Sequence, residues 1–238
     1  MARISLFGVT IRPGKLGTKL TRENYAIIDN KCTTHEKVDD YYNMFWGEKR
    51  REAFLKIYED ESATTYTYAW CEEHKRKVLF NFDLNMKFFE SLAHDEFSKE
   101  IDRFLKKNNA FKEITNLNLA IGKSGYYILI LDEYCQIYIG TAKNIKRRVM
   151  SHWSKKKQFD RLIFGSVERS KLSIDSFRAL DTTRILATFT DGVYTDEDDY
   201  INAFSSKFLA NRTSGGIPEF GGLSILANAK HRNLEDFN

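Results

Sequence analysis

The sequence predicts an α+β protein made of two unequal domains and a tail. Hydrophobic residues make up 42% of the 238 residues and aromatic residues 14%, which is enough material for more than one core. Short β-rich segments alternate with longer segments whose apolar residues have helical spacing. An asparagine-rich region over residues 108–118 lies near the middle of the chain. We therefore expect an α+β domain over residues 1–118, a second domain over residues 119–214 with a small three-stranded antiparallel sheet flanked by helices, and a glycine-rich tail over residues 215–238.

The first domain is expected to contain both helices and strands. Residues 4–11 alternate as a strand does, and residues 36–59 and 87–107 have the apolar spacing of amphipathic helices. Two β-rich runs, 64–70 and 78–84, flank a charged segment and predict a hairpin. We expect this domain to recognise the molecule on which the second domain acts.

The second domain is expected to begin with a hairpin over residues 125–140. Two β-rich runs are bounded by glycines, and the polar pair Asp132-Glu133 lies midway between them. A two-residue turn there places Tyr127 opposite Tyr138, so that both tyrosines lie on one face. The other face is nearly all apolar and is expected to pack on a core.

A helix is expected directly after this hairpin. Asn144 is a suitable N-cap, and the residues that follow at helical spacing form one face of the helix. They are Ile145, Arg148, Val149, His152 and Trp153. An arginine on this face is either a structural ion-pair partner or a contact to substrate. A histidine there is either a satisfied core residue or a substrate contact, and both interpretations stay open.

The remaining segments complete the second domain. Residues 184–190 predict the third strand, and residues 159–166 resemble a short strand. Residues 171–183 are polar enough for a loop or surface excursion, and a helix is expected from residue 195 to about residue 210.

Glu197 has a particular place in that last helix. It lies on the same stripe as Ile201, Phe204 and Phe208, whereas Asp198 faces the polar side. A carboxylate on an apolar stripe is costly unless a cation or a donor meets it. The pattern therefore favours Glu197 over its acidic neighbours as a metal ligand, with a capping role for Glu197 as the alternative.

Positive charge is concentrated after the hairpin. The whole chain has a net charge of only +4, but residues 141–161 hold eight basic side chains and one acid. The basic residues are Lys143, Lys146, Arg147, Arg148, Lys155, Lys156, Lys157 and Arg161. Such a stretch is either a solvated helix face or a site for a polyanion backbone, and its position beside the paired tyrosines favours nucleic acid.

Cysteine usage and hydropathy exclude several classes of protein. Three cysteines and no charged-then-apolar segment at Met1 argue against a disulfide scaffold and against secretion, so a cytoplasmic location is expected. No apolar run approaches the ~20 residues that cross a bilayer.

Two Cys-x-x-His pairs form a candidate zinc site at Cys32, His35, Cys71 and His74. The alternative is that both pairs lie in charged turns and never meet.

The second domain resembles the GIY-YIG nuclease superfamily. The two triplets are Gly125-Tyr126-Tyr127 and Tyr138-Ile139-Gly140, with Tyr126 in place of the family's isoleucine. The superfamily's arginine, histidine, glutamate and asparagine have counterparts in the same order. These are Arg148, His152, Glu197 and Asn211. The resemblance covers roughly residues 124–212.

The resemblance implies a metal-dependent DNA endonuclease that hydrolyses phosphodiester bonds, site-specific in the manner of restriction or homing enzymes. Tyr127 is then the general base or the group that orients water, and nearby cations or a metal-bound water are expected to depress its pKa. Tyr138 assists, Arg148 holds the scissile phosphate, and Glu197 binds one hydrated Mg²⁺. Asn211 is expected to fix the local backbone.

Alternatives to this function come from other classes. The chain could instead be a non-cleaving DNA-binding subunit, a structure-specific repair subunit, or an enzyme that acts on RNA. The presence of all four residues to which the resemblance assigns the chemistry argues against a loss of cleavage. These are Tyr127, Tyr138, Arg148 and Glu197. Double-stranded DNA is the expected partner, and a dimer is compatible with the sequence.

Overall fold

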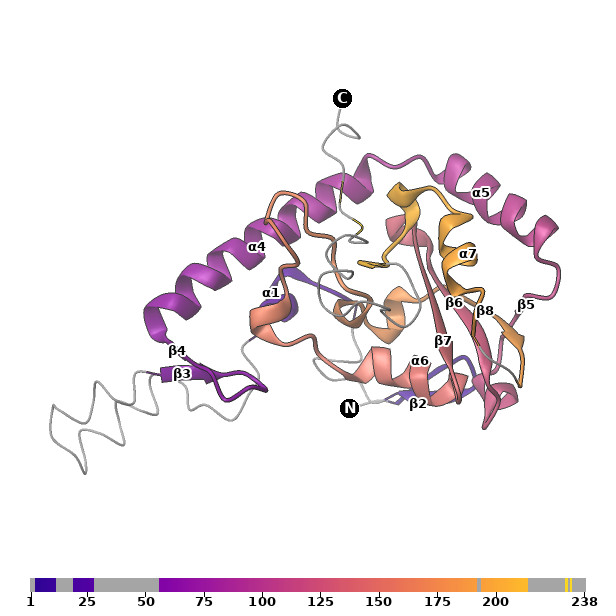
Figure 1. Cartoon of the computed structure of the whole chain (residues 1–238), viewed down its shortest axis with the longest axis horizontal. Helices are drawn as coiled ribbons and strands as arrows, with labels where there is room; N and C mark the ends of the chain where they lie inside the picture. The colour runs from indigo at the N-terminus through magenta and orange to yellow at the C-terminus, as the bar shows by residue number, and fades with distance from the viewer. Residues whose placement is uncertain are drawn as a thin grey trace, which may run out of the picture.

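The computed structural model of the chain describes residues 3–11, 19–27, 56–191, 194–213, 230 and 232, and these residues form an α+β fold (Figure 1). The helices within these ranges are α1 (Arg22–Tyr25), α4 (Tyr68–Glu90), α5 (His94–Lys107), α6 (Ile145–Ser154) and α7 (Glu197–Asn202). The strands are β1 (Ile4–Leu6), β2 (Val9–Ile11), β3 (Lys56–Glu59), β4 (Thr65–Thr67), β5 (Lys112–Glu113), β6 (Gly125–Leu131), β7 (Gln136–Ala142) and β8 (Arg184–Phe189). No helix in the described ranges has the length and apolarity to cross a membrane.

The main sheet has four antiparallel strands in the order β5-β8-β6-β7, so the prediction of three strands is wrong. The additional strand, β5, is only two residues long and pairs Lys112 with Ala187 at the edge of the sheet. Two residues are too few to show β periodicity in a sequence. Strand β5 also precedes residue 118, so the sheet draws on both predicted domains, and the division at residue 118 stays a prediction.

The hairpin β6-β7 forms with a longer turn than predicted. Leu131 pairs with Gln136 and Tyr127 with Gly140, because a 3₁₀ turn at Asp132–Tyr134 and one left-handed residue, at φ 48°, connect the strands. The predicted pairing of Tyr127 with Tyr138 is therefore wrong by two residues. A shift of two keeps every side chain on its predicted face, so the two tyrosines still lie on the same face of the sheet.

Several elements of the first half differ from their predictions. The predicted strand over 4–11 is a two-stranded hairpin, β1-β2, that turns at Phe7 and Gly8 with positive φ angles of 46° and 67°. The predicted hairpin over 64–84 is instead the strand β4 followed by the 23-residue helix α4, which Thr67 caps through its side chain. The charged segment inside α4 consists of good helix formers, which outweigh the β propensity on either side. The helix predicted over 87–107 is the end of α4 plus α5, and of the helix predicted over 36–59 only β3 is described.

The second half contains three further differences. Residues 159–161 form a 3₁₀ turn rather than a strand. The predicted surface excursion over 171–183 is mostly buried, with Arg178 and Asp181 among its buried residues. The last helix, α7, ends at Asn202 instead of about residue 210. The strand predicted over 184–190 and the helix capped by Asn144 are confirmed as β8 and α6.

Helices α6 and α7 contact the sheet from its two sides. Helix α6 contacts the face that carries Tyr127 through its His152 ring. Helix α7 contacts β7, and Tyr200 packs on Tyr126 of the opposite face, with ring centroids 5.0 Å apart. Because β7 is an edge strand, groups from both faces come together around it.

Candidate active site

The two tyrosines of the triplets lie side by side on the sheet. The ring centroids of Tyr127 and Tyr138 are 6.2 Å apart, and Tyr127 is fully buried. Glycine is needed at Gly140 and at Gly125 for different geometric reasons. A Cβ at Gly140 would lie 2.6 Å from the Tyr127 hydroxyl, and one at Gly125, where φ is +147°, would lie 2.1 Å from the carbonyl oxygen of Thr188. Gly140 thus leaves space for the tyrosine, and Gly125 allows β8 to approach β6.

His152 links Tyr127 to an acid that the sequence did not indicate. The Tyr127 hydroxyl lies 2.7 Å from His152 Nε2, and His152 Nδ1 lies 2.6 Å from Asp175 Oδ1. The three residues come from β6, α6 and a 3₁₀ turn at Ile174–Ser176. His152 is therefore a buried side chain with both ring nitrogens bonded, as in a satisfied core histidine. It also borders a pocket, and its contact with a substrate stays a prediction.

Arg148 lies beside both phenols although its side chain is exposed. Burial raises the pKa of Tyr127 well above its usual value, the neighbouring Tyr138 raises it further, and the Arg148 charge opposes both effects. Burial likewise raises the pKa of Tyr138 against the Arg148 charge. Cations were expected to depress the pKa of Tyr127, but burial outweighs them in this structure. Both phenols are therefore neutral in the resting protein.

A pocket of about 420 Å³ opens beside these residues. The side chains around it that carry charge or hydrogen-bonding groups include Tyr138, Arg148, His152, Lys157, Arg161 and Asp175. Burial lowers the pKa of Lys157, and the nearby Arg212 lowers it further. A pocket with this excess of cations is suited to a phosphate group.

Glu197 reaches this region from the opposite face of the sheet. Thr141 Oγ1 on β7 donates to Glu197 Oε2 at 3.3 Å, and the Glu197 charge raises the pKa of Tyr127 and of Tyr138. The Tyr126 hydroxyl accepts a hydrogen bond from the Asp196 amide at 3.1 Å, so the residue that replaces the family's isoleucine anchors the start of α7. The neighbouring Asp198, expected on the polar side, is half-buried.

Glu197 is the carboxylate that would hold a divalent cation near the two phenols. Among the described residues no three His, Cys, Asp or Glu side chains converge on a common point. Mg²⁺ commonly uses one or two carboxylates and completes its octahedron with water and substrate phosphate oxygens. The magnesium site at Glu197 stays a prediction.

Asn211 supports the backbone, and its neighbours Ala210 and Arg212 line the pocket. Its Oδ1 accepts from the Ile139 amide at 3.1 Å, and its Nδ2 donates to the Ile139 carbonyl at 2.9 Å. Ile139 lies between Tyr138 and Gly140 in the second triplet. Asn211 therefore holds the strand that carries Tyr138.

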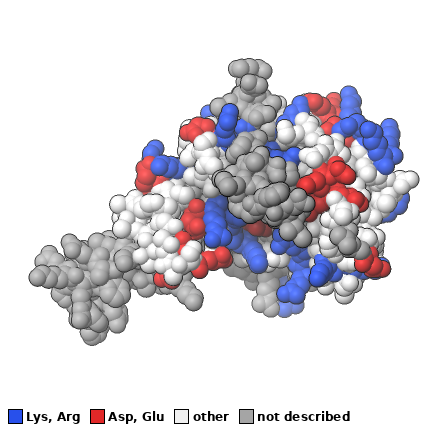
Figure 2. All heavy atoms as spheres, in the orientation of Figure 1, with Lys and Arg blue, Asp and Glu red and all other residues white. Residues whose placement is uncertain are grey.

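The residues predicted to bind DNA separate into two groups. Lys146, Arg147 and Lys155 border a second cavity, of about 560 Å³, on the outer side of α6. Lys157 and Arg161 instead border the pocket of Tyr138 and Arg148. Lys143 is exposed and Lys156 half-buried. Figure 2 shows Lys and Arg atoms gathered over α6, and acidic atoms gathered over α7 on the same face.

The zinc prediction is only partly covered by the structure. Cys32 and His35 lie outside the described residues. Cys71 is buried in α4, and His74 Nε2 lies 2.8 Å from the Phe159 carbonyl oxygen. That contact occupies one of the two ring nitrogens that could bind a metal, and the zinc site stays a prediction.

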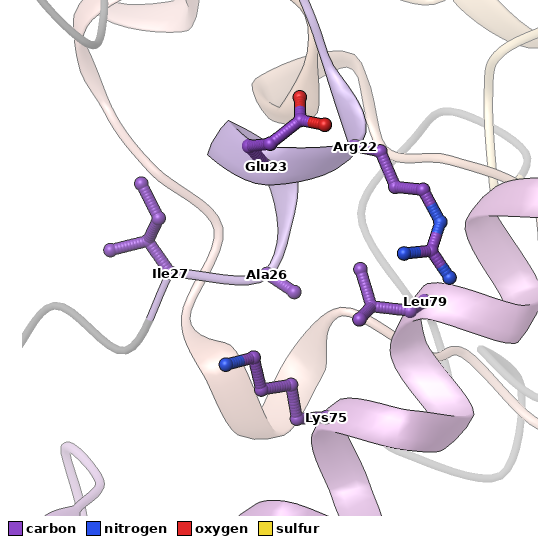
Figure 3. A pocket seen from close by; sticks show the side chains of 6 residues that line it. All are labelled: Arg22, Glu23, Ala26, Ile27, Lys75 and Leu79. Atoms are coloured by element: carbon purple, nitrogen blue, oxygen red, sulfur yellow. The ribbon is translucent and has the colours of Figure 1, made fainter.

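A further cavity of about 470 Å³, shown in Figure 3, lies between α1 and α4. Glu23 of α1 and Lys75 of α4 are among its lining residues, and the described part of its lining contains no histidine, cysteine or tyrosine. Its arginine, Arg22, is already paired with Asp83 at 2.8 Å. This cavity therefore offers fewer side chains suited to catalysis than the pocket beside Arg148.

Asp175 is the residue of the site that sequence reasoning missed. It lies in the segment predicted to be a surface excursion, between the buried residues Ile174 and Phe177. An acid inside a run with apolar neighbours on both sides was the available signal.

A scan against protein-family models, a search of curated proteins and a search of solved structures each found no match for the chain.

Proposed function

We propose that this chain is a metal-dependent DNA endonuclease that hydrolyses phosphodiester bonds in the pocket beside Arg148. The observation that carries the proposal is a cationic pocket lined by Tyr138, His152 and the exposed Arg148, with the buried Tyr127 bonded to His152 and a carboxylate close to both phenols. These are the groups that the resemblance to the GIY-YIG superfamily implies. Hydrolysis of a phosphodiester depends mainly on positioning and on charge neutralisation, which such groups supply.

Arg148 binds the scissile phosphate through its planar guanidinium. The Arg148 charge acts on both phenols, so a phosphate held by Arg148 lies next to their hydroxyls. Lys157 and Arg161 neutralise charge in the same pocket. A Mg²⁺ ion held by Glu197 would stabilise negative charge on the phosphate and the leaving oxygen.

Tyr127 acts as a proton relay, because its raised pKa excludes a standing phenolate. As the water oxygen forms its bond to phosphorus, Tyr127 takes a proton from that water and passes its own proton to His152 Nε2. The bond from phosphorus to the leaving sugar oxygen breaks, and that oxygen takes a proton from solvent. His152 then returns its proton to solvent, and Tyr138 orients the phosphate by hydrogen bonding.

Supercoiled plasmid provides the test. The purified chain is expected to convert it to nicked and linear forms with Mg²⁺ and not with EDTA, and Tyr127→Phe is expected to bind the plasmid without cutting it. Sequencing of the ends then separates a site-specific enzyme, with defined ends, from a structure-specific one that cuts at branched DNA. Cutting of RNA but not DNA, or no cutting of either, would contradict the proposal.

A further inference from the structure

We propose that Asp175 is a positioning residue for the cleavage reaction, because it holds His152 in the tautomer whose Nε2 accepts the proton of Tyr127. The inference rests on the proposed function and assigns a role to an acid outside the family-like motif. Its basis is the unbroken chain of contacts from Tyr127 through His152 to Asp175, with distances of 2.7 Å and 2.6 Å.

Hydrogen bonds fix the backbone of the turn that carries Asp175. The His152 side chain is 2% exposed and that of Asp175 27% exposed, so the carboxylate is the more accessible of the two groups. Asp175 lies in a 3₁₀ turn, and its own amide donates a hydrogen bond to Ser173 Oγ at 3.4 Å. Arg178 Nη1 donates to the Asp175 carbonyl at 3.0 Å. The carboxylate is therefore presented to His152 by an ordered turn that itself contacts α6.

The identity of the partner determines the tautomer. Burial alone would raise the pKa of Asp175, but the hydrogen bond from His152 and the charges of Lys157 and Arg148 bring it below its usual value. An ionised carboxylate only accepts hydrogen bonds, so Nδ1 carries the hydrogen and Nε2 of the neutral imidazole is an acceptor. The Tyr127 hydroxyl must then donate to Nε2, which is the direction that the proposed proton transfer requires.

Asp175 has a second effect once the proton has moved. Transfer from Tyr127 leaves an imidazolium on a buried ring, and a buried charge is costly without a partner. The carboxylate 2.6 Å away supplies that partner. Loss of the carboxylate therefore both permits the wrong tautomer and destabilises the product of the transfer, while the phosphate contacts of Arg148 are retained.

The test compares Asp175→Asn with Asp83→Asn, which removes the charge of an acid that pairs with Arg22 and does not line this pocket. Single-turnover cleavage of plasmid is expected to fall about 10²–10⁴-fold in Asp175→Asn, the usual contribution of a positioned proton-transfer group, with unchanged DNA affinity. Asp83→Asn is expected to cleave at the wild-type rate.

The second readout is the ¹⁵N NMR spectrum of the imidazole nitrogens of the full chain, with the His152 signals assigned by their loss in His152→Gln. Wild-type His152 is expected to be protonated at Nδ1, and Asp175→Asn is expected to gain the Nε2-protonated form. Protonation at Nε2 in the wild type overturns the proposal, even if Asp175→Asn does not fold. An Asp175→Asn variant that cleaves at the wild-type rate, or that cleaves slowly with an unchanged tautomer, also overturns it. The two proposals can also fail separately. If the wild-type chain cuts no nucleic acid but Asp175→Asn still gains the Nε2-protonated form, the proposed function is refuted and the role of Asp175 in fixing the His152 tautomer is supported.

Discussion

Gly140→Ala perturbs the centre of the site with a single methyl group. Gly140 has no positive φ, so space alone requires glycine there. The added Cβ would lie 2.6 Å from the Tyr127 hydroxyl oxygen, 2.8 Å from Tyr127 Cζ and 3.0 Å from Tyr138 Cε1, whereas ordinary contact begins at 3.4 Å. Both neighbours are parts of tyrosine rings, and the Tyr127 ring is fully buried, so it has no free space into which it can turn.

The magnitude of the effect follows from these distances. Restoring ordinary contact moves the hydroxyl by about 0.8 Å, the difference between 2.6 Å and 3.4 Å, which displaces it from the position of its 2.7 Å bond with His152. Overpacking of this kind costs about 1–3 kcal/mol, or about 2–12 °C in Tm for a domain of this size. A misplacement near 1 Å costs about 10²-fold in rate. We expect Gly140→Ala to show both losses.

Thermal melting by circular dichroism and single-turnover cleavage of plasmid measure the two losses. The double variant Gly140→Ala/Tyr127→Phe removes the oxygen that makes the closest contact, so it is expected to recover part of the lost Tm and none of the cleavage. A Gly140→Ala protein with wild-type Tm and wild-type cleavage would refute the placement of the Tyr127 hydroxyl against β7.

Three other variants examine separate parts of the site. Arg148→Ala is expected to lose about 10²–10³-fold in cleavage at unchanged Tm, because its side chain is exposed and binds charge instead of filling a core; a wild-type rate would exclude it as the phosphate ligand. Alanine at both Arg147 and Lys155 is expected to reduce the slope of log affinity against log salt by up to about 2, with unchanged cleavage positions, measured by DNA binding at several salt concentrations; an unchanged slope would exclude the outer side of α6 as a phosphate contact. Glu197→Gln is expected to abolish Mg²⁺-dependent cleavage and keep DNA binding, while Asp199→Asn, an exposed neighbour in the same turn, is expected to keep both; loss of cleavage in Asp199→Asn alone would show that the metal ligand is misassigned.

The second half of the fold was largely predictable because its signals are local. The hairpin, the helix capped by Asn144 and the strand β8 follow from periodicity and capping within short windows. The register of the hairpin was missed by two residues because Asp132-Glu133 is a weak turn signal and the chain uses a longer connection ending at Cys135. The faces survived this error because side chains alternate with a period of two.

The parts that were missed depend on contacts between distant segments. Strand β5 is defined by its pairing with β8. Asp175 becomes part of the site only because its turn packs against α6, about 23 residues away in sequence from His152. Local periodicity carries no information about such contacts.

The most direct measurement is hydrolysis of a plasmid-derived DNA duplex in H₂¹⁸O with Mg²⁺, followed by mass spectrometry of the cleaved ends. Direct attack by water at the Arg148 pocket predicts one ¹⁸O in each newly formed terminal phosphate, with Tyr127→Phe giving no labelled product under the same conditions. Cleaved ends without ¹⁸O, or equal labelled product from wild type and Tyr127→Phe, would contradict hydrolysis at this site.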